Sequence, residues 1–161
     1  MPVADDNLLD SFWTVARQLR RRSREVLAPW DVSPSQSRAL GVLLRHGQLR
    51  LGELSDHLHI VPRSVTEVVD GLQERGWCLR EPDPADRRAT VVSLTDSGRA
   101  LARSIRAAQQ NQARAYFAVL GGEERAQLAA ILDRLTGAVP GTPNAGHGAG
   151  QDVPGGRPGG S

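Results

Sequence analysis

Two adjacent arginines are the residues with the clearest chemical potential in this sequence. Arg87 and Arg88 follow Asp86 within residues 82–88, a polar stretch that is rich in turn-forming residues. A guanidinium group at the tip of a loop gains nothing from a protein core, whereas it fits the narrow, electronegative minor groove of DNA. We expect Asp86 to orient one of the two guanidinium groups through a bidentate ion pair. The segment therefore predicts a contact with nucleic acid.

A second set of polar side chains lies on a helix that we expect to begin at Pro62. Its apolar residues recur at helical spacing and would face the core, which leaves a polar face outside. Backbone N–H groups and the helix dipole favour phosphate at such an N-terminus, although a polar helix face is as often only solvated. The apolar stripe comprises Val65, Val68, Val69 and Leu72, and the outward residues are Arg63, Ser64, Thr66, Glu67 and Asp70.

The elements around these residues form a recognisable order. Two short helices, over residues 51–59 and 62–75, are joined by a tight turn. Strands over residues 77–81 and 90–94 follow at once and enclose the arginine segment. This layout is typical of a winged helix-turn-helix, in which the second helix enters the major groove of DNA.

Long helices flank this unit on both sides. Apolar spacing predicts one over residues 6–27, and Thr95 caps another of about 24 residues, which would be roughly 36 Å long at 1.5 Å per residue. Between them a capping box of Ser33 and Gln36 starts a helix, and a break at Gly121-Gly122 precedes the last one. Long amphipathic helices on a small lobe leave apolar faces that need a partner, which favours a homodimer over a monomer with a closed four-helix core.

The expected fold is mainly α-helical with a small β-hairpin wing, within one domain over residues 1–136. The winged helix-turn-helix lobe would span about residues 33–98, and the dimerisation helices about 6–28 and 95–136. Residues 137–161 are rich in Gly and Pro and cannot bury enough apolar surface to offset their ordering entropy, so we expect a flexible tail.

The sequence also predicts where the protein resides. No apolar run approaches the ~18–20 residues that a membrane span needs, and the acidic start of the chain is unlike a secretory signal. Cys78 is the only cysteine, so no intrachain disulfide can form. We expect a cytoplasmic protein without membrane association.

The charge balance leaves a second class of function open. All 20 basic residues are arginines, and the formal net charge is +2. Within residues 38–99 arginines and acidic residues are equal in number, so the bulk basic character of many nucleic-acid-binding domains is absent. A winged-helix module that binds another protein, without sequence-specific DNA binding, is therefore the alternative.

Residues 49–77 and 79–101 resemble the helix-turn-helix and wing of the MarR family of multiple-antibiotic-resistance regulators. The Asp-x-Arg wing signature is present as Asp86-Arg87-Arg88, and it is followed by the strand exit Val92-Ser93-Leu94-Thr95 and by Gly98. The resemblance covers about residues 6–136. It implies a homodimer whose first and last helices interlock, with two recognition helices that read a palindromic operator, more often as a repressor than as an activator.

The resemblance also implies a set of site residues. The helix that begins at Pro62 would lie in the major groove, and Arg88, or Arg87 beside it, would enter the minor groove. Glu67 and Gly71 depart from the family pattern, which often has Arg there, although Glu67 is able to accept a hydrogen bond from cytosine N4. The residues expected to contact double-stranded DNA are Ser35, Arg38, Pro62, Arg63, Ser64, Thr66, Glu67, Asp86, Arg87 and Arg88.

A basic run in the first helix is a candidate site for a small ligand. The resemblance implies a small anionic effector, often aromatic or phenolic, between the dimerisation helices and the DNA-binding lobe. Arg17, Arg21 and Arg24 would bind it, within a run of five arginines over residues 17–24. The alternative is that the run is a solvated helix face.

Other reactive residues do not form a site in the sequence. His46, His57 and His59 lack the spacing of a zinc site, and Cys78 is expected to be a buried small hydrophobe rather than a redox sensor. No nucleotide-binding glycine loop, nucleophile–base pair or paired carboxylates are present. We therefore expect no enzyme activity, metal or cofactor.

Overall fold

The computed structural model describes residues 5–137. Residues up to Tyr116 form one compact unit, and residues from Phe117 form a second. The first contains α1 (Asp5–Leu27), the 3₁₀ turn η1 (Ala28–Trp30), α2 (Pro34–His46), β1 (Leu49–Arg50), α3 (Leu51–Leu58), α4 (Pro62–Glu74), β2 (Cys78–Pro82), β3 (Thr90–Leu94) and α5 (Asp96–Tyr116). The second contains η2 (Phe117–Val119) and α6 (Gly122–Gly137).

The predicted fold class, mainly helical with a small wing, is confirmed, with one addition to the sheet. The wing hairpin is joined by β1, so that three antiparallel strands lie in the order β1-β3-β2. Leu49 and Arg50 of β1 pair with Val92 and Val91 of β3. A strand of two residues shows no alternation of its own, which is why the sequence pattern predicted only the hairpin.

The predicted helix starts are built as expected. The Ser33 hydroxyl accepts the Gln36 N–H at 3.1 Å, and the Gln36 side-chain oxygen accepts the Ser33 N–H at 3.0 Å, which completes the capping box at α2. The Thr95 hydroxyl accepts the Gly98 N–H at 3.0 Å and so caps α5. At 21 residues α5 is shorter than predicted, because the turn η2 intervenes before Gly121.

The hydrophobic core lies under the helix-turn-helix. Leu40 of α2, Leu54 of α3, Leu72 of α4 and Val92 of β3 are fully buried together. The inward stripe predicted for α4 is observed, since Val65 and Val69 are also buried and Val68 packs against the core at its edge. This packing sets which face of α4 remains in solvent.

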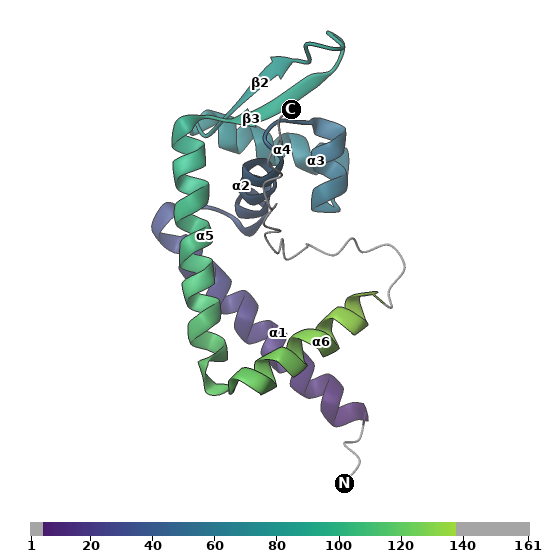
Figure 1. Cartoon of the computed structure of the whole chain (residues 1–161). Helices are drawn as coiled ribbons and strands as arrows, with labels where there is room; N and C mark the ends of the chain where they lie inside the picture. Colours follow the sequence, from purple (N-terminus) through teal and green to yellow (C-terminus); the bar gives the residue numbers. More distant parts are fainter. Residues whose placement is uncertain (1–4, 138–161) are drawn as a thin grey trace, which may run out of the picture. The chain divides into compact units, whose positions relative to one another are not determined.

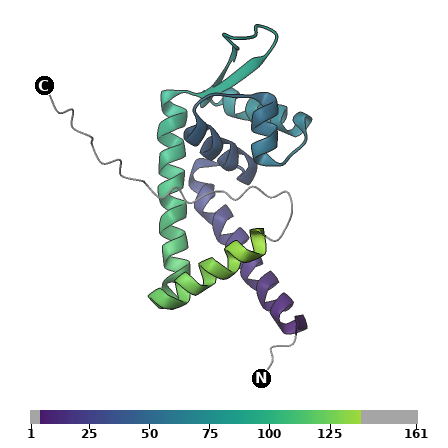
Figure 2. The same cartoon turned by 45° about the vertical axis from the view of Figure 1, so that its right-hand side comes forward.

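The helices α1 and α5 extend from this lobe, and they lie side by side over part of their length (Figures 1 and 2). Leu27 at the end of α1 and Ile105 in α5 are buried in the core cluster. Further along, the Tyr116 hydroxyl donates to the Gln18 side-chain oxygen at 3.0 Å. Both helices thus emerge from the lobe at fixed points.

The α6 helix ends at Gly137, the residue at which we expected the tail to begin. The rest of that predicted tail lies outside the described residues. On α6 itself Ile131 and Leu135 are 50% and 57% exposed. Among residues 5–137, no helix is both long enough and apolar enough to cross a membrane.

Gly98 provides a test of how closely the wing packs on α5. A Cβ atom at this position would lie 1.9 Å from the Trp77 carbonyl oxygen, whereas one at Gly41 in α2 would meet nothing within 4 Å. We expect Gly98→Ala to lower the free energy of unfolding by about 1–3 kcal/mol. The control Gly41→Ala should raise it by up to about 1 kcal/mol through helix propensity. Equal urea denaturation midpoints for both variants would contradict this packing.

Candidate nucleic-acid interface

The N-terminal half of α4 presents its polar residues to solvent. Arg63 Nε lies 3.8 Å from Glu67 Oε1, and these side chains are 91% and 71% exposed, so their contact is a loose surface pair. The Thr66 hydroxyl donates to the Pro62 carbonyl at 3.2 Å and is therefore occupied by its own helix. Ser64 is half-buried. Arg63, Thr66 and Glu67 are therefore exposed as the sequence predicted, whereas Ser64 is partly covered.

The turn between α3 and α4 is held from two sides. The Ser55 hydroxyl donates to the Ile60 carbonyl at 2.6 Å, and His59 adopts a left-handed conformation with φ of 52°. Arg38 Nη2 donates to the Leu58 carbonyl at 3.0 Å. Arg38, which we expected on DNA, thus also fixes the end of α3. Ser35, on the first turn of α2, is half-buried.

The wing loop is closed by its own backbone. The Asp83 N–H donates to the Ala89 carbonyl at 2.9 Å, and the Ala89 N–H donates to the Asp86 carbonyl at 2.9 Å. The prediction that Asp86 forms an ion pair with a neighbouring arginine is wrong. Its carboxylate instead accepts a hydrogen bond from the Arg88 backbone N–H at 3.0 Å. A short carboxylate beside its own turn satisfies the nearest backbone donor at little entropic cost.

The arginines at the wing tip are exposed. The β2–β3 hairpin carries them away from the helices (Figures 1 and 2). Within residues 5–137 neither Arg87 nor Arg88 forms an ion pair. Both guanidinium groups are therefore available to an anionic partner.

An ion pair that the sequence analysis missed holds the base of this loop. Arg50 Nε and Nη2 lie 2.6 Å and 2.5 Å from Asp83 Oδ2, and Asp83 Oδ1 accepts the Ala85 N–H at 2.8 Å. The Ala85 N–H and the Arg50 guanidinium hold the pKa of the Asp83 carboxyl below its usual value. Asp83 was assigned to the exposed tip with Asp86, yet its side chain is only 12% exposed.

Arg80, which the sequence did not predict to belong to the site, joins the wing to α4. Arg80 of β2 has Nη2 2.5 Å from Asp70 Oδ1 and Nη1 2.7 Å from Gln73 Oε1, and its Nη2 also lies 3.3 Å from the Thr66 carbonyl. The Asp70 carboxylate, predicted on the outward face, is paired with the wing. No spacing rule links residues ten apart on a helix and a strand, so the sequence offered no signal for this contact.

Residues 5–137 contain no group of three or more His, Cys, Asp or Glu side chains arranged to hold a metal ion. The His46 and His57 rings are stacked with centroids 4.4 Å apart. Cys78 is buried, and burial raises the pKa of its thiol, which disfavours the reactive thiolate.

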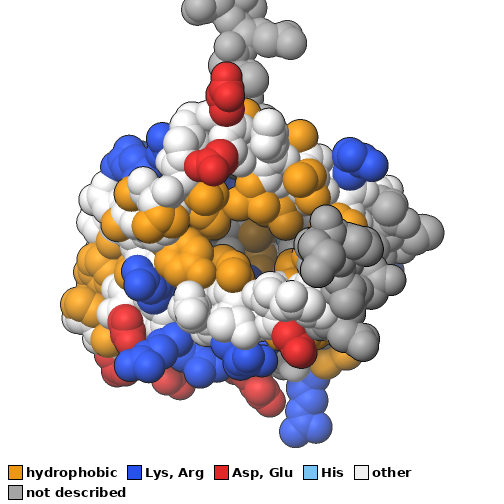
Figure 3. Space-filling view, turned by 90° about the horizontal axis from the view of Figure 1, so that it is seen from below, with side chains coloured by type: hydrophobic (Ala, Val, Ile, Leu, Met, Phe, Trp, Pro, Cys, Tyr) orange, Lys and Arg blue, Asp and Glu red, His pale blue; other side chains and the backbone are white. Residues whose placement is uncertain are grey.

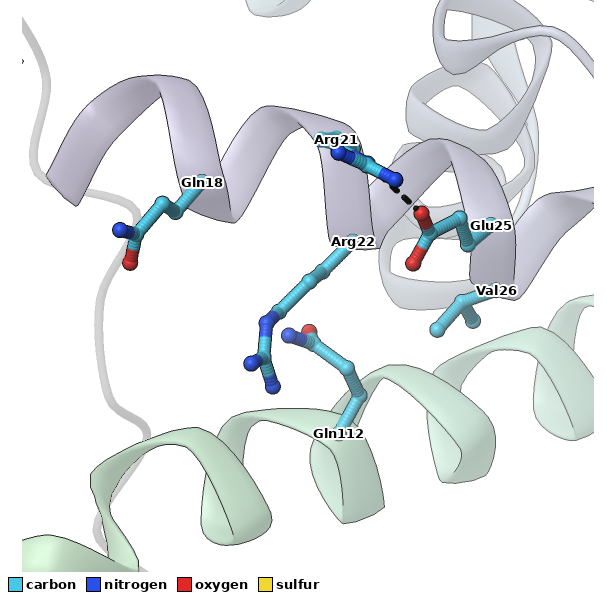
Figure 4. A pocket seen from close by; sticks show the side chains of 6 residues that line it. All are labelled: Gln18, Arg21, Arg22, Glu25, Val26 and Gln112. Carbon is cyan, nitrogen blue, oxygen red and sulfur yellow. Dashed lines mark hydrogen bonds and ion pairs between the residues drawn. The ribbon is translucent and has the colours of Figure 1, made fainter. Parts of the chain in front are cut away.

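A hollow of about 630 Å³ lies between α1 and α5 (Figure 4). Arg21 lines it and is paired with Glu25 at 3.0 Å, whereas Arg17 and Arg24, also expected there, are not among its lining residues. Arg22 of α1 and Gln112 of α5, which the sequence analysis did not select, extend toward each other across the hollow. Gln112 Nε2 is buried there and has no hydrogen-bond partner among residues 5–137.

Known proteins share this arrangement. The MarR family matches residues 32–90, which run from just before α2 to the first residue of β3. A crystal structure of a cysteine-to-serine variant of MarR from E. coli, complexed with operator DNA, is similar with a TM-score of 0.71 and 26% identity, over 80% of this chain and 92% of that chain.

Relatives of known sequence match over most of their length. An HTH-type transcriptional regulator from Mycobacterium bovis is 33% identical over 129 residues, which are 80% of this chain and 87% of the relative. The HTH-type transcriptional repressor MdtR of Bacillus subtilis is 28% identical over 142 residues, 86% of this chain and 92% of the relative. The chain belongs to the MarR family of winged helix-turn-helix transcription regulators, which are not enzymes.

Proposed function

We propose that this protein is a ligand-responsive repressor that binds a palindromic operator as a homodimer. The observation that carries the DNA-binding part is the joint presentation of two elements: the exposed N-terminus of α4, and a wing that is tied to α4 through Arg80 and ends in unpaired Arg87 and Arg88. Operator DNA bound to the E. coli MarR variant supports the same use of the fold here.

In the proposed complex α4 enters the major groove. Arg63 suits guanine and Glu67 suits cytosine N4, so these neighbours read the two bases of one pair or of adjacent pairs. Arg87 and Arg88 bind in the adjoining minor groove, where a narrow groove concentrates negative potential. The full proposed contact set is Ser35, Arg38, Pro62, Arg63, Ser64, Thr66, Glu67, Asp86, Arg87 and Arg88, with Asp86 acting through the backbone of the loop.

The exposed apolar surface of α1 supports dimerisation. Figure 3 shows hydrophobic side chains exposed to solvent in the view from below. On α1 alone, Leu8, Leu9, Phe12 and Trp13 are 61%, 55%, 49% and 44% exposed. Contiguous apolar surface of this kind is costly in water and marks an interaction site. A second copy would bury it and present a second α4 to a symmetric site.

The hollow between α1 and α5 is the proposed effector site. Arg22 and the unpartnered Gln112 Nε2 are donors suited to a carboxylate or phenolate, and Val26 supplies an apolar wall. Since α1 and α5 both continue into the lobe, an effector that prefers one spacing of these helices would change DNA affinity by its differential affinity for the two states. Repression rather than activation is proposed by likeness to MdtR, and the protein would act in the cytoplasm, with the DNA.

Selection of duplexes from random DNA, followed by a salt titration, tests this function. We expect a palindromic site whose binding weakens steeply with salt because bound counterions are released. Arg88→Ala should lower affinity for it by about 1–3 kcal/mol and reduce the salt slope by about 1. Arg106→Ala, which removes an exposed arginine in the middle of α5, is the control. A protein-binding module would yield no selected site and no steep salt slope.

A charge on the apolar face of α1 tests dimerisation. Phe12→Glu should shift the protein toward monomer in sedimentation equilibrium, because burial of a Phe side chain contributes about 1.5–3 kcal/mol. Thr14→Glu places the same charge on the opposite face of α1 and should leave the dimer intact. The assignment fails if the wild-type protein is monomeric or if both variants dimerise equally.

Benzoate and 2-hydroxybenzoate are suitable probes for the effector site. Arg22→Ala and Gln112→Leu should each weaken their binding in calorimetry by about tenfold, as expected for loss of a charged or buried hydrogen bond. Arg24→Ala, which removes a charge from α1 outside the hollow, should bind the probes like the wild type. An equal loss in Arg22→Ala and Arg24→Ala, with Gln112→Leu binding like the wild type, would show a general effect of charge instead of a site.

A further inference from the structure

A side-chain contact at the base of the wing loop attaches it to the helix-turn-helix. Arg50 lies at the junction of β1 and α3, and Asp83 lies at the start of the wing loop, 33 residues away in sequence. The backbone of Arg50 is itself held, because its N–H donates to Glu53 Oε2 at 2.7 Å and it pairs with Val91 in the sheet. Asp83 is therefore anchored to a fixed point.

The two oxygens of Asp83 have separate tasks. Oδ2 accepts both Nε and Nη2 of Arg50, and Oδ1 accepts the Ala85 N–H. One carboxylate thus shapes the first turn of the loop and also ties that turn to the lobe. Arg87 and Arg88 follow within five residues, so their position depends on where this turn is held.

The pair lies outside the main core. The core cluster of the lobe, which includes Leu40, Leu54 and Val92, does not contain Arg50 or Asp83. Arg50 is itself substantially exposed, with 45% of its side chain accessible. Loss of the pair should therefore loosen the loop while the lobe stays folded.

We propose that Arg50 and Asp83 are positioning residues for DNA binding, which hold the wing tip where Arg87 and Arg88 reach the minor groove while α4 occupies the major groove. Neither residue needs to touch DNA. Without the pair, the loop would occupy the productive position for only part of the time, and apparent affinity falls in proportion to that fraction. This inference rests on the proposed role of the wing.

The sign of the effect distinguishes positioning from simple electrostatics. Asp83→Asn removes a negative charge, which by charge alone would strengthen binding to a polyanion. We expect it instead to weaken binding to the selected duplex by about tenfold, as when the productive fraction falls to a tenth. Glu81→Gln removes a charge from neighbouring β2 without touching the loop anchor, and it should bind equally well or slightly more tightly.

A double-mutant cycle with the wing tip completes the test. In a variant with Arg87→Ala and Arg88→Ala, the position of the loop no longer matters, so adding Asp83→Asn should cause no further loss. Arg50→Lys keeps the positive charge but loses the paired Nε and Nη2 donors. Its affinity for the duplex should lie between those of the wild type and Asp83→Asn. Thermal melting of each variant confirms that the lobe is folded, and Arg50→Lys replaces Asp83→Asn in the cycle if the latter does not fold.

Two results would overturn the inference, and they differ. If Asp83→Asn weakens the wing-tip variant as much as the wild type, the pair acts by some route other than the wing. If the wing-tip variant binds the selected duplex as tightly as the wild type, the wing contact in the proposed function is itself wrong. Tighter binding by Asp83→Asn would also contradict positioning.

Discussion

Burial of the apolar stripe of α4 is the interaction on which the rest of the structure depends. Val65, Val69 and Leu72 are excluded from solvent against α2, α3 and the sheet, and burial of such side chains contributes about 1.5–3 kcal/mol each. Because a helix has only one orientation that buries this stripe, the same packing turns Arg63 and Glu67 outward. Core packing alone therefore orients the face of α4 that is proposed to contact the bases.

A wing is useful to a DNA-binding protein only if it keeps a constant position relative to the recognition helix, since the two grooves are a fixed distance apart. In the proposed complex, two arginines would meet that requirement. Arg80 ties the stem of the wing to α4, and Arg50 ties its loop to the start of α3. Guanidinium groups suit this task because their several planar donors fix direction as well as distance.

The same contacts explain why the equal charge count of the lobe does not describe the charges that an approaching polyanion would meet. Asp70 and Asp83 are paired with Arg80 and Arg50 within the protein. The wing tip, in contrast, carries Arg87 and Arg88, which form no ion pair with any other residue that the structure describes. A polyanion responds to the charges that lie close to it, within about a Debye length of 8–10 Å, so the local arrangement matters more than the sum.

The sequence by itself determined the order of the helices, the hairpin, the capping box at Ser33 and the exposed arginines of the wing. These features depend on periodicity, turn residues and hydrogen bonds between residues three or four apart. Only the tertiary structure decided that β1 joins the sheet, that Asp86 binds a backbone N–H, and that Arg50, Arg80, Arg22 and Gln112 acquire their partners or their hollow. The contacts of β1, Arg50, Arg80, Arg22 and Gln112 join segments far apart in the chain, so their geometry exists only once the core has packed. The partner of Asp86 is only two residues away, and the conformation of the loop decided between a backbone N–H and a guanidinium group.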